Sequence, residues 1–551
     1  ESIKKIIEEK IEENSTEAAG YIIDRYAKRN KLEDEKDKQI MFTILVRAIK
    51  ANKNNFFKSL MENEIIKKEM ISYKKNSNEV TLLHMACLFG RDVIAKLLIE
   101  KGTEIEASDK NGGRALMLAA GKGHIEVCKL LIEKGAEIEA SDSNGFRTLM
   151  IAAVKGQKEV CELLIEKGAE IEAANKGGVR ALMLAAGKGH IEICRLLIEK
   201  GAEIEATNGD EGGARALMLA ANNGHKEVCE LLIEKGAEIE AANGGGFRAL
   251  MLAAHKGHKE VCVLLIDRGA EIEAANKDGK GALMLAAREG RREVCELLIE
   301  KGAEIEASDS DGLRALMLAA INGYKEVCEL LIEKGAEIEA SNKYGTRALM
   351  LAAINGGRKV CELLIEKGAE IEVSDSNGFR ALMLAAINGY KEVCELLIEK
   401  GAEIEAANVG GFRALMLAAN KGHKEVCDLL IERGAEVNAA NEDGWTAVML
   451  SAFNSHKEVC ELLIEKGAEI EASNGNGVRV FMIAAQGGHK EVCELLIENG
   501  AEIEPSDGNG FRALMLAAQG GHKEVCELLI EKGAEIEASD SNGLRALMLA
   551  A

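Results

Sequence analysis

A segment of 33 residues returns along most of this chain, and this repetition constrains the fold more than any other feature. The segment is clear at Ser308–Ala340, and the Cys-Glu-Leu-Leu marks at Cys295, Cys328, Cys361 and Cys394 give its period. A fixed period of this length is typical of repeat architectures, in which each unit is one small supersecondary element. We therefore expect an array of such elements, each in contact with its neighbours, rather than a set of compact domains.

The period sets the predicted organisation of the chain. Residues 1–75 lie outside the repeat, and a divergent first repeat follows at 76–107. Thirteen full repeats cover 108–538, and a truncated repeat follows at 539–551. The repeat at 207–241 has a two-residue insertion around Gly209–Asp210. Because residue 1 is Glu and the last repeat stops early, we expect the chain to be a fragment of a longer protein.

Each repeat is predicted to form two short antiparallel helices followed by a turn. In the repeat at Ser308–Ala340, the apolar run Ala315–Ala320 is too short to be stable as a free helix. Lys325–Lys334 then has apolar residues at helical spacing. Gly335 follows where a left-handed helix cap is expected, and the Asp- or Asn-rich tetrads before glycines such as Gly345 are typical of tight turns. The expected fold is an all-α repeat solenoid of helix pairs joined by β-turn fingers.

The order of residue types within the repeat matches a known pattern. It has a turn Asp and Gly, a Leu and two Ala, a Gly-His pair, a Val and two Leu, and a closing Gly-Ala, here represented by Asp375, Gly378, Leu382, Ala385, Ala386, Gly422, His423, Val393, Leu396, Leu397, Gly401 and Ala402. The divergent first repeat keeps more of the pattern, as Thr81, Leu82, Leu83 and His84. In these features residues 76–551 resemble the ankyrin repeat family. The resemblance implies a curved ankyrin-type stack that binds protein partners.

The first 75 residues have helical patterning without the repeat. Helices are predicted around Ile3–Ile11, from a cap at Ser15 to Tyr26, over Ile40–Ile49 and over Phe56–Ile66, with the charged stretch Lys28–Lys38 as a link. Because the terminal units of a solenoid need a solvated outer face, we expect this helical region to cap the array. A separate docking domain is the alternative.

The charge of the repeats excludes several classes of partner. The chain has a net charge of −22, yet its first 75 residues carry 17 Lys and Arg against 14 Asp and Glu, so the acidic excess lies in the repeats. Contacts to phosphate supply most nucleic-acid affinity, and anionic lipid attracts basic segments. We therefore expect neither nucleic acid nor a membrane surface as partner, and no apolar run approaches the ~18 residues of a membrane span.

The cysteines and histidines recur at fixed positions of the repeat. Of the 14 cysteines, thirteen occupy one slot from Cys128 to Cys526, and Cys87 is the other. Equivalent slots one repeat apart are too distant for a disulfide, and no Cys-x-x-Cys pair suggests zinc. Free thiols favour a reducing compartment, here the cytoplasm. No acid or nucleophile recurs beside the Gly-His turns, so we predict no catalytic, cofactor or metal site.

Two positions depart from the family pattern together. The family's Thr at the start of the first helix is Arg in twelve of the fourteen regular units, and its closing Asn is Glu, eight residues earlier. Arg does not cap a helix, and its charge opposes the helix dipole. We predict Glu–Arg pairs across the junctions, such as Glu405 with Arg413. At Asn438 and Thr446 both positions revert, which supports the pairing but also fits an older copy of the repeat.

The variable positions indicate where a partner is expected to bind. In the ankyrin family, contacts come mostly from the residue after the turn Gly and from the end of the first helix, on the concave side. Here apolar and aromatic residues in these two slots are densest between Leu313 and Phe453. We predict a protein-binding surface formed by Leu313, Ile321, Ile354, Phe379, Ile387, Phe412, Trp445 and Phe453. Packing between neighbouring fingers is the alternative role for these side chains.

These features together predict a non-catalytic scaffold that binds a protein partner through the concave groove. The alternative is an elastic or spacer rod, in which length matters more than the groove. The sequence does not name the partner, and we expect the chain to be a monomer.

Overall fold

The computed structural model of the chain describes residues 2–27, 35–64, 66, 70–71, 73–74, 78–209 and 213–550. Several predicted features lie outside the described residues: the start of the first repeat at 76–77, most of the charged link at 28–34, Ile65, the insertion at 210–212 and the final Ala551. By its contacts the chain forms two compact units, Glu1–Lys277 and Asp278–Ala551, called the N-terminal and C-terminal units below.

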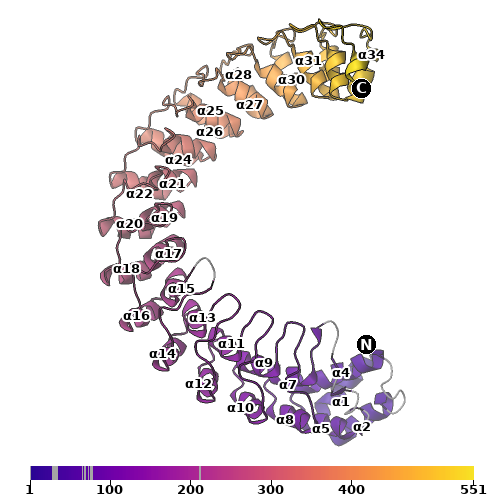
Figure 1. Cartoon of the computed structure of the whole chain (residues 1–551), viewed down its shortest axis with the longest axis vertical. Coiled ribbons are helices and arrows are strands. Elements are labelled where there is room, and N and C mark those ends of the chain that lie inside the picture. Colours follow the sequence, from indigo (N-terminus) through magenta and orange to yellow (C-terminus); the bar gives the residue numbers. More distant parts are fainter. Residues whose placement is uncertain are drawn as a thin grey trace. The chain divides into compact units, whose positions relative to one another are not determined.

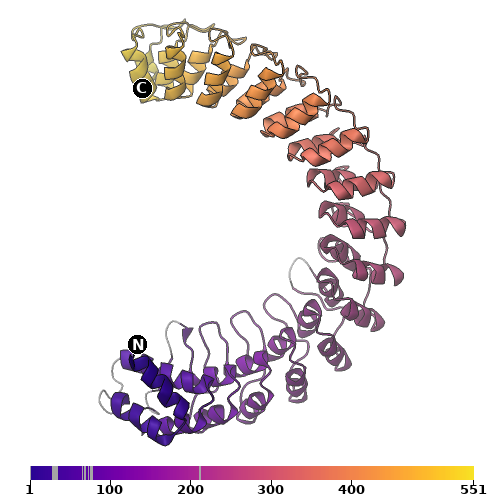
Figure 2. The same cartoon turned by 180° about the vertical axis from the view of Figure 1, so that it is seen from behind.

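In the N-terminal unit, each repeat contributes two helices (Figures 1 and 2). The first helices are α7 (Leu82–Leu88), α9 (Ala115–Lys122), α11 (Thr148–Val154), α13 (Ala181–Lys188), α15 (Ala216–Asn222) and α17 (Ala249–Lys256). The second helices are α8 (Asp92–Glu100), α10 (Ile125–Glu133), α12 (Lys158–Glu166), α14 (Ile191–Glu199), α16 (Lys226–Glu234) and α18 (Lys259–Asp267).

The C-terminal unit repeats the arrangement. Its first helices are α19 (Ala282–Arg288), α21 (Ala315–Ile321), α23 (Ala348–Ile354), α25 (Ala381–Ile387), α27 (Ala414–Asn420), α29 (Ala447–Phe453), α31 (Val480–Gln486), α33 (Ala513–Gln519) and α35 (Ala546–Leu549). Its second helices are α20 (Arg292–Glu300), α22 (Lys325–Glu333), α24 (Arg358–Glu366), α26 (Lys391–Glu399), α28 (Lys424–Glu432), α30 (Lys457–Glu465), α32 (Lys490–Glu498) and α34 (Lys523–Glu531).

The predicted fold class is confirmed. The described residues contain helix pairs and no named strand, and isolated antiparallel bridges such as Ser308 with Arg314 close the fingers. The predicted cap at Gly335 is also confirmed, because this residue has a φ of +100°, which an L side chain rarely adopts. None of the described helices has both the length and the apolar character needed to cross a lipid bilayer.

The core is shared between neighbouring repeats. Ala319, Ala320, Cys328 and Leu331 are all 0% exposed, and their equivalents recur along the chain. Because the first helices are rich in Ala, they pack closely on the first helices of the adjacent repeats, whereas the Leu-rich second helices lie further apart. Closer packing on the side of the first helices curves the array toward that side, as Figure 1 shows for the N-terminal unit. A single helix pair has little apolar core of its own, so its stability depends on its neighbours.

The region before the first repeat continues the stack of helix pairs, which the sequence did not predict. It contains α1 (Ser2–Glu13), α2 (Thr16–Ile22), the π-helix η1 (Ile23–Ala27), α4 (Glu35–Lys50) and α5 (Asn54–Glu62). Helix α4 packs on α7 and α5 packs on α8, while α1 and α2 pack on α4 and α5 in the same order. Phe42, Phe56 and Phe57 are buried in these contacts.

Two predictions for this region have different outcomes. Ser15 caps α2 as predicted, because its side chain accepts the Ala18 N–H at 3.1 Å. The prediction that the link reaches Lys38 is wrong, because α4 already begins at Glu35. Glu35 and Asp37 lie in the first turn of this helix, where negative charge stabilises the exposed N–H groups.

The predicted Glu–Arg pairs are present at every junction that carries the Arg. Glu405 Oε2 lies 3.1 Å from Arg413 Nε. The same pair forms at Arg114, Arg147, Arg180, Arg215, Arg248, Arg314, Arg347, Arg380, Arg479, Arg512 and Arg545. The side chain of Arg413 is 26% exposed and that of Glu405 is 37% exposed, but the paired Nε and Oε2 atoms are buried. The ion pair is therefore partly desolvated, so solvent screening weakens the attraction between its charges less than in a fully exposed pair.

The pair of Glu405 and Arg413 also binds the backbone of the next repeat. Glu405 Oε1 accepts the N–H of Glu436 at 3.0 Å, and Arg413 Nη1 donates to the carbonyl of Ala440 at 3.0 Å. Glu405 and Arg413 thus connect their own junction with the backbone at Glu436 and at Ala440. The Arg begins its helix without capping it by its side chain, as the sequence indicated. Its side chain instead stabilises the junction between repeats, through Glu405 and the Ala440 carbonyl.

The reverted junction shows why the two positions change together. Asn438 Oδ1 accepts the N–H of Glu469 at 2.8 Å, and Asn438 Nδ2 donates to the carbonyl of Gly467 at 3.0 Å. Asn therefore supplies both an acceptor and a donor, whereas a Glu carboxylate only accepts. When Glu replaces Asn, the Arg supplies the donors. Thr446 does not cap its helix by its side chain, so recovery of a cap does not explain its presence.

We predict that the two positions are energetically coupled. Asn438→Glu alone leaves a carboxylate without its Arg, and Thr446→Arg alone adds a cation without its Glu, so each should destabilise α29 and α30. The double variant should recover about 0.5–1 kcal/mol relative to the sum of the single changes. Hydrogen exchange of α29 and α30 measures the effect locally. The reverse exchange, Glu372→Asn with Arg380→Thr, is the matched control, and strictly additive effects at both junctions would contradict the coupling.

Candidate functional site

The fingers are rigid turns built by one Asp or Asn side chain. In the finger at Asp375, Oδ1 accepts the N–H groups of Asn377 and Phe379, both at 2.9 Å. The backbone N–H of Gly378 donates to the Asp375 carbonyl at 3.0 Å. These bonds give the Asp of the Asp-Ser-Asn-Gly turns a structural role, because its carboxylate holds the backbone of the turn. They also fix the position of the residue after the turn Gly, which is the first predicted contact slot.

Successive fingers are joined to one another by backbone hydrogen bonds. Ser376 N–H donates to the Tyr344 carbonyl at 3.0 Å, and Val409 N–H donates to the Asn377 carbonyl at 3.1 Å. A Cβ added to Gly378 would lie 2.7 Å from the Val409 nitrogen, and its φ is +80°. Close approach and backbone conformation both require Gly there. Such bonds join most neighbouring fingers into a ribbon.

The histidine row connects neighbouring repeats. His423 Nε2 lies 3.1 Å from the Ile387 carbonyl, which is the last residue of α25 in the preceding repeat. His456 contacts the Asn420 carbonyl at 3.2 Å in the same way, and His489 contacts the Phe453 carbonyl at 2.9 Å. Each ring therefore binds the unpaired C-terminal end of a neighbouring first helix.

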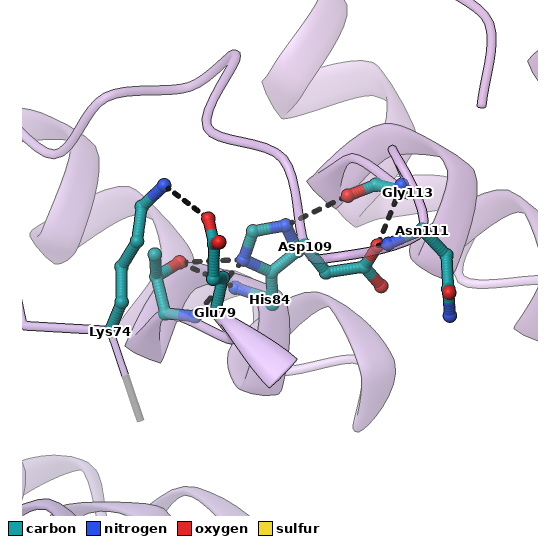
Figure 3. Close-up of polar contacts among 7 residues, drawn as sticks. Lys74, Glu79, His84, Asp109, Asn111 and Gly113 are labelled. Atoms are coloured by element: carbon teal, nitrogen blue, oxygen red, sulfur yellow. Dashed lines mark hydrogen bonds and ion pairs between the residues drawn. The ribbon is translucent and has the colours of Figure 1, made fainter. Parts of the chain in front are cut away.

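The first repeat has a second kind of histidine, which Figure 3 shows facing the next finger. Buried His84 accepts the Thr81 N–H at Nδ1, at 3.1 Å, so its Nε2 carries the proton and donates to the Gly113 carbonyl at 3.2 Å. Asp109 Oδ1 accepts the Gly113 N–H at 2.8 Å. Thr81 also caps α7 in a reciprocal box with His84. Thr446 has Met449 in place of this His, so the reciprocal box cannot form there.

The structure gives the eight predicted contact residues unequal exposure. Leu313, Phe379, Phe412 and Trp445 follow the turn Gly of their fingers and are half-buried. A Cβ added to Gly410 would lie 3.2 Å from the Phe412 ring, so this ring lies back against its own turn. Part of the apolar character of the slot therefore belongs to finger packing.

The slot at the end of the first helix is more open. Ile321, Ile354 and Ile387 are half-buried, and Phe453 is 55% exposed. The Phe453 and Trp445 rings meet edge to face, with centroids 5.8 Å apart. The finger slot and the helix-end slot of one repeat thus come together into one aromatic pair.

Two exposed apolar residues were missed by the sequence reasoning. Tyr344 is 54% exposed and Val409 is 69% exposed, and both lie in the finger turn itself, before the turn Gly. Lys343 stacks over the Tyr344 ring with 5.1 Å between its Nζ and the ring centroid, and it also pairs with Asp311. The available signal was an apolar residue in a turn tetrad that otherwise holds polar residues and Gly.

The cysteines have the environment of inert core residues. Thirteen are buried and Cys526 is half-buried, and all are free thiols. Burial raises the pKa of the Cys328 thiol to about 12, so little reactive thiolate exists near neutral pH. Across the described part of the chain, no cluster of three or more His, Cys, Asp or Glu residues has the geometry to hold a metal ion.

We predict that the first repeat loses stability in mild acid. Burial lowers the pKa of His84, although the Gly113 carbonyl and Asp109 favour the charged ring and Lys74 disfavours it. Its stabilising effect is therefore complete above the unfolded pKa of about 6.5 and is lost as the pH falls through the lower folded pKa. Hydrogen exchange of α7 and α8, corrected for intrinsic rates, should show this loss. His84→Met, the residue type of most other repeats, should remove the pH dependence, and an unchanged profile in that variant would contradict the assignment.

Comparison with known families agrees with this geometry. A family model described as ankyrin repeats in three copies matches residues 83–175, 149–243, 217–309, 250–342, 316–408, 382–474 and 481–551. A second, described as ankyrin repeats in many copies, matches residues 452–497. A search of curated proteins finds no match. Ankyrin repeats are in general protein–protein interaction modules without catalytic activity. The family matches, the helix pairs and the hydrogen-bonded fingers lead to one conclusion: this chain belongs to the ankyrin repeat family.

Proposed function

We propose that the chain is a non-catalytic scaffold that binds a protein partner through the inner surface of its C-terminal unit. The contact surface consists of the residues after the turn Gly and the ends of the first helices: Leu313, Ile321, Ile354, Phe379, Ile387, Phe412, Trp445 and Phe453. We add Tyr344 and Val409, because their side chains are exposed on fingers of the same stretch of repeats.

The observation that carries this proposal is the aromatic pair of Trp445 and Phe453. The fold does not require an aromatic residue at the end of the first helix, because Gln486 and Gln519 occupy the same position in later repeats. Phe453 nevertheless leaves more than half of its surface in water, where an apolar ring gains nothing. Exposed aromatic residues beside half-buried ones are favoured anchors for a partner.

The proposal also assigns roles to the rest of the chain. Residues 1–75 cap the array, since α4 and α5 cover the apolar face that the first repeat would otherwise expose. We propose the repeats as 76–107, the thirteen over 108–538 with the insertion in 207–241, and the truncated repeat 539–551. The free, buried thiols support a reducing compartment, and we propose the cytoplasm.

A spacer rod is the second candidate, and the uniform junctions favour it. The same Glu–Arg contacts and finger hydrogen bonds recur with little change in both units. Such an array behaves as a series of equal elastic elements. In this case the apolar residues of the C-terminal unit have no ligand, and their replacement leaves the function of the chain in the cell unchanged.

We predict that the two candidates differ in photo-crosslinking. A benzoylphenylalanine at position 453 or 409 should capture the same partner protein in the source cell. The same group in place of Glu432, an exposed residue at the end of α28, should not. Equal products from all three positions, or none, would favour the spacer.

The accompanying stability control uses Phe453→Gln. This change should alter the free energy of unfolding by less than about 0.5 kcal/mol, because the ring is largely exposed. A larger loss would mean that Phe453 serves the packing of its own repeat rather than a partner.

A further inference from the structure

A hollow of about 320 Å³ lies in the N-terminal unit between a finger and the first helices. Its apolar lining comes from Leu88 at the end of α7, Met117 and Leu118 on α9, and Ile151 on α11. Three successive repeats therefore contribute to it. The volume is at the lower end of the range for ligand sites, which suits one large side chain better than a small-molecule ligand.

The hollow exists because two glycines coincide in this repeat. Gly113 follows the turn Gly, where the neighbouring repeat has Phe146, and Gly121 takes the helix-end position that holds Ile321 in the C-terminal unit. Gly121 lies directly beside Ile151, since a Cβ added to it would be 3.0 Å from the Ile151 Cγ2 atom. In the other regular repeats at least one of these positions carries a side chain larger than Ala, such as Val179 beside Gly187, and here both positions are Gly.

The wall on the finger side is held in place before any ligand binds. Gly113 is bonded on both sides, by its carbonyl to His84 and by its N–H to Asp109 (Figure 3). Asp109 Oδ1 also accepts the Asn111 N–H at 2.8 Å. A preformed wall of this kind lowers the ordering cost of binding.

The wall on the helix side carries unpaired positive charge. Lys122 and Lys155 line the hollow and are exposed, and among the described residues neither forms an ion pair. Some lysines on the second helices do find partners, such as Lys129 with Glu126 at 2.8 Å. In later repeats of this unit the position after the helix-end slot holds Lys again, as Lys188 and Lys256. In the C-terminal unit the same position is frequently Asn, as in Asn322, Asn355 and Asn388.

We propose that this hollow binds one apolar side chain of an acidic peptide segment in a partner protein. The side chain enters between Gly113 and Gly121, and an adjacent Asp or Glu of the peptide pairs with Lys122 and Lys155. The site goes beyond the surface proposed for the C-terminal unit and does not depend on it, because its residues all lie in the N-terminal unit.

Charge favours a short acidic peptide over a nucleic acid. The hollow also contains Asp109 and Asp142 on its finger side, and the repeats around it carry a large acidic excess. An extended polyanion would meet these charges along its whole length. A peptide with one or two carboxylates reaches the lysines and leaves its apolar side chain on the uncharged floor.

The test is selection of a random twelve-residue peptide library on the full chain, followed by fluorescence anisotropy of the enriched peptides. We expect Leu, Ile, Met or Phe beside Asp or Glu in these peptides. Gly113→Leu should weaken their binding at least tenfold, because the added side chain occupies the hollow. The variant should keep the finger, since Leu313 and Leu544 occupy this position and bond to the equivalent Asp in their own repeats. Lys122→Gln with Lys155→Gln should weaken it three- to tenfold and reduce its salt dependence.

Two matched controls define the contrary outcomes. Lys134→Gln with Lys167→Gln removes the same charge at the C-terminal ends of α10 and α12, and Phe453→Gln alters only the C-terminal unit; both should leave the affinity within twofold. Peptides without acidic residues, or peptides insensitive to both the Gly113 and the lysine variants, would overturn the proposal. So would tight binding of poly(U) RNA that the lysine variant abolishes and the Gly113 variant preserves.

Discussion

The structure depends on contact between successive helix pairs, because no pair has a core of its own. Ala319 and Ala320 on α21 and Leu331 on α22 are fully buried, and each of these helices packs both on its partner and on helices of the adjacent repeats. Burial of apolar area supplies most of the free energy. The polar groups at the junction then decide how each neighbour is oriented, because buried donors and acceptors must be paired.

This division of roles explains how nearly identical repeats carry different surfaces. The alanines, the Leu-rich second helices and the finger Asp or Asn are occupied by the fold and scarcely change. The finger residue and the helix-end residue have few structural duties, so they vary between Gly, Phe, Ile and Trp without disturbing the stack. The N-terminal unit has a hollow at these positions, edged by lysines that follow the helix-end residue, and the C-terminal unit has mostly half-buried aliphatic and aromatic residues there. One architecture thus presents two chemically different inner surfaces.

The sequence predicted the elements that arise from periodic patterns. It did not predict features that depend on how side chains of different segments pack together in space. The helix pair at Ala315–Ile321 and Lys325–Glu333, the cap at Gly335 and the Glu–Arg pairs all follow from residue type and spacing. The half-burial of Phe412 was not predictable, because it depends on how the ring turns back over Gly410. The hollow beside Gly113 depends on residues of three repeats, and the helix pairs before the first repeat lack the repeat pattern altogether.

The central claim is that each repeat is stabilised by its immediate neighbours. The most direct measurement is hydrogen exchange across the whole chain after Leu331→Ala, which removes a fully buried side chain at a cost of about 2–5 kcal/mol. The account predicts that protection falls in α21 and α22, falls less in α19, α20, α23 and α24, and is unchanged in distant repeats. An equal loss of protection along the whole chain, or a loss confined to α21 and α22, would contradict it.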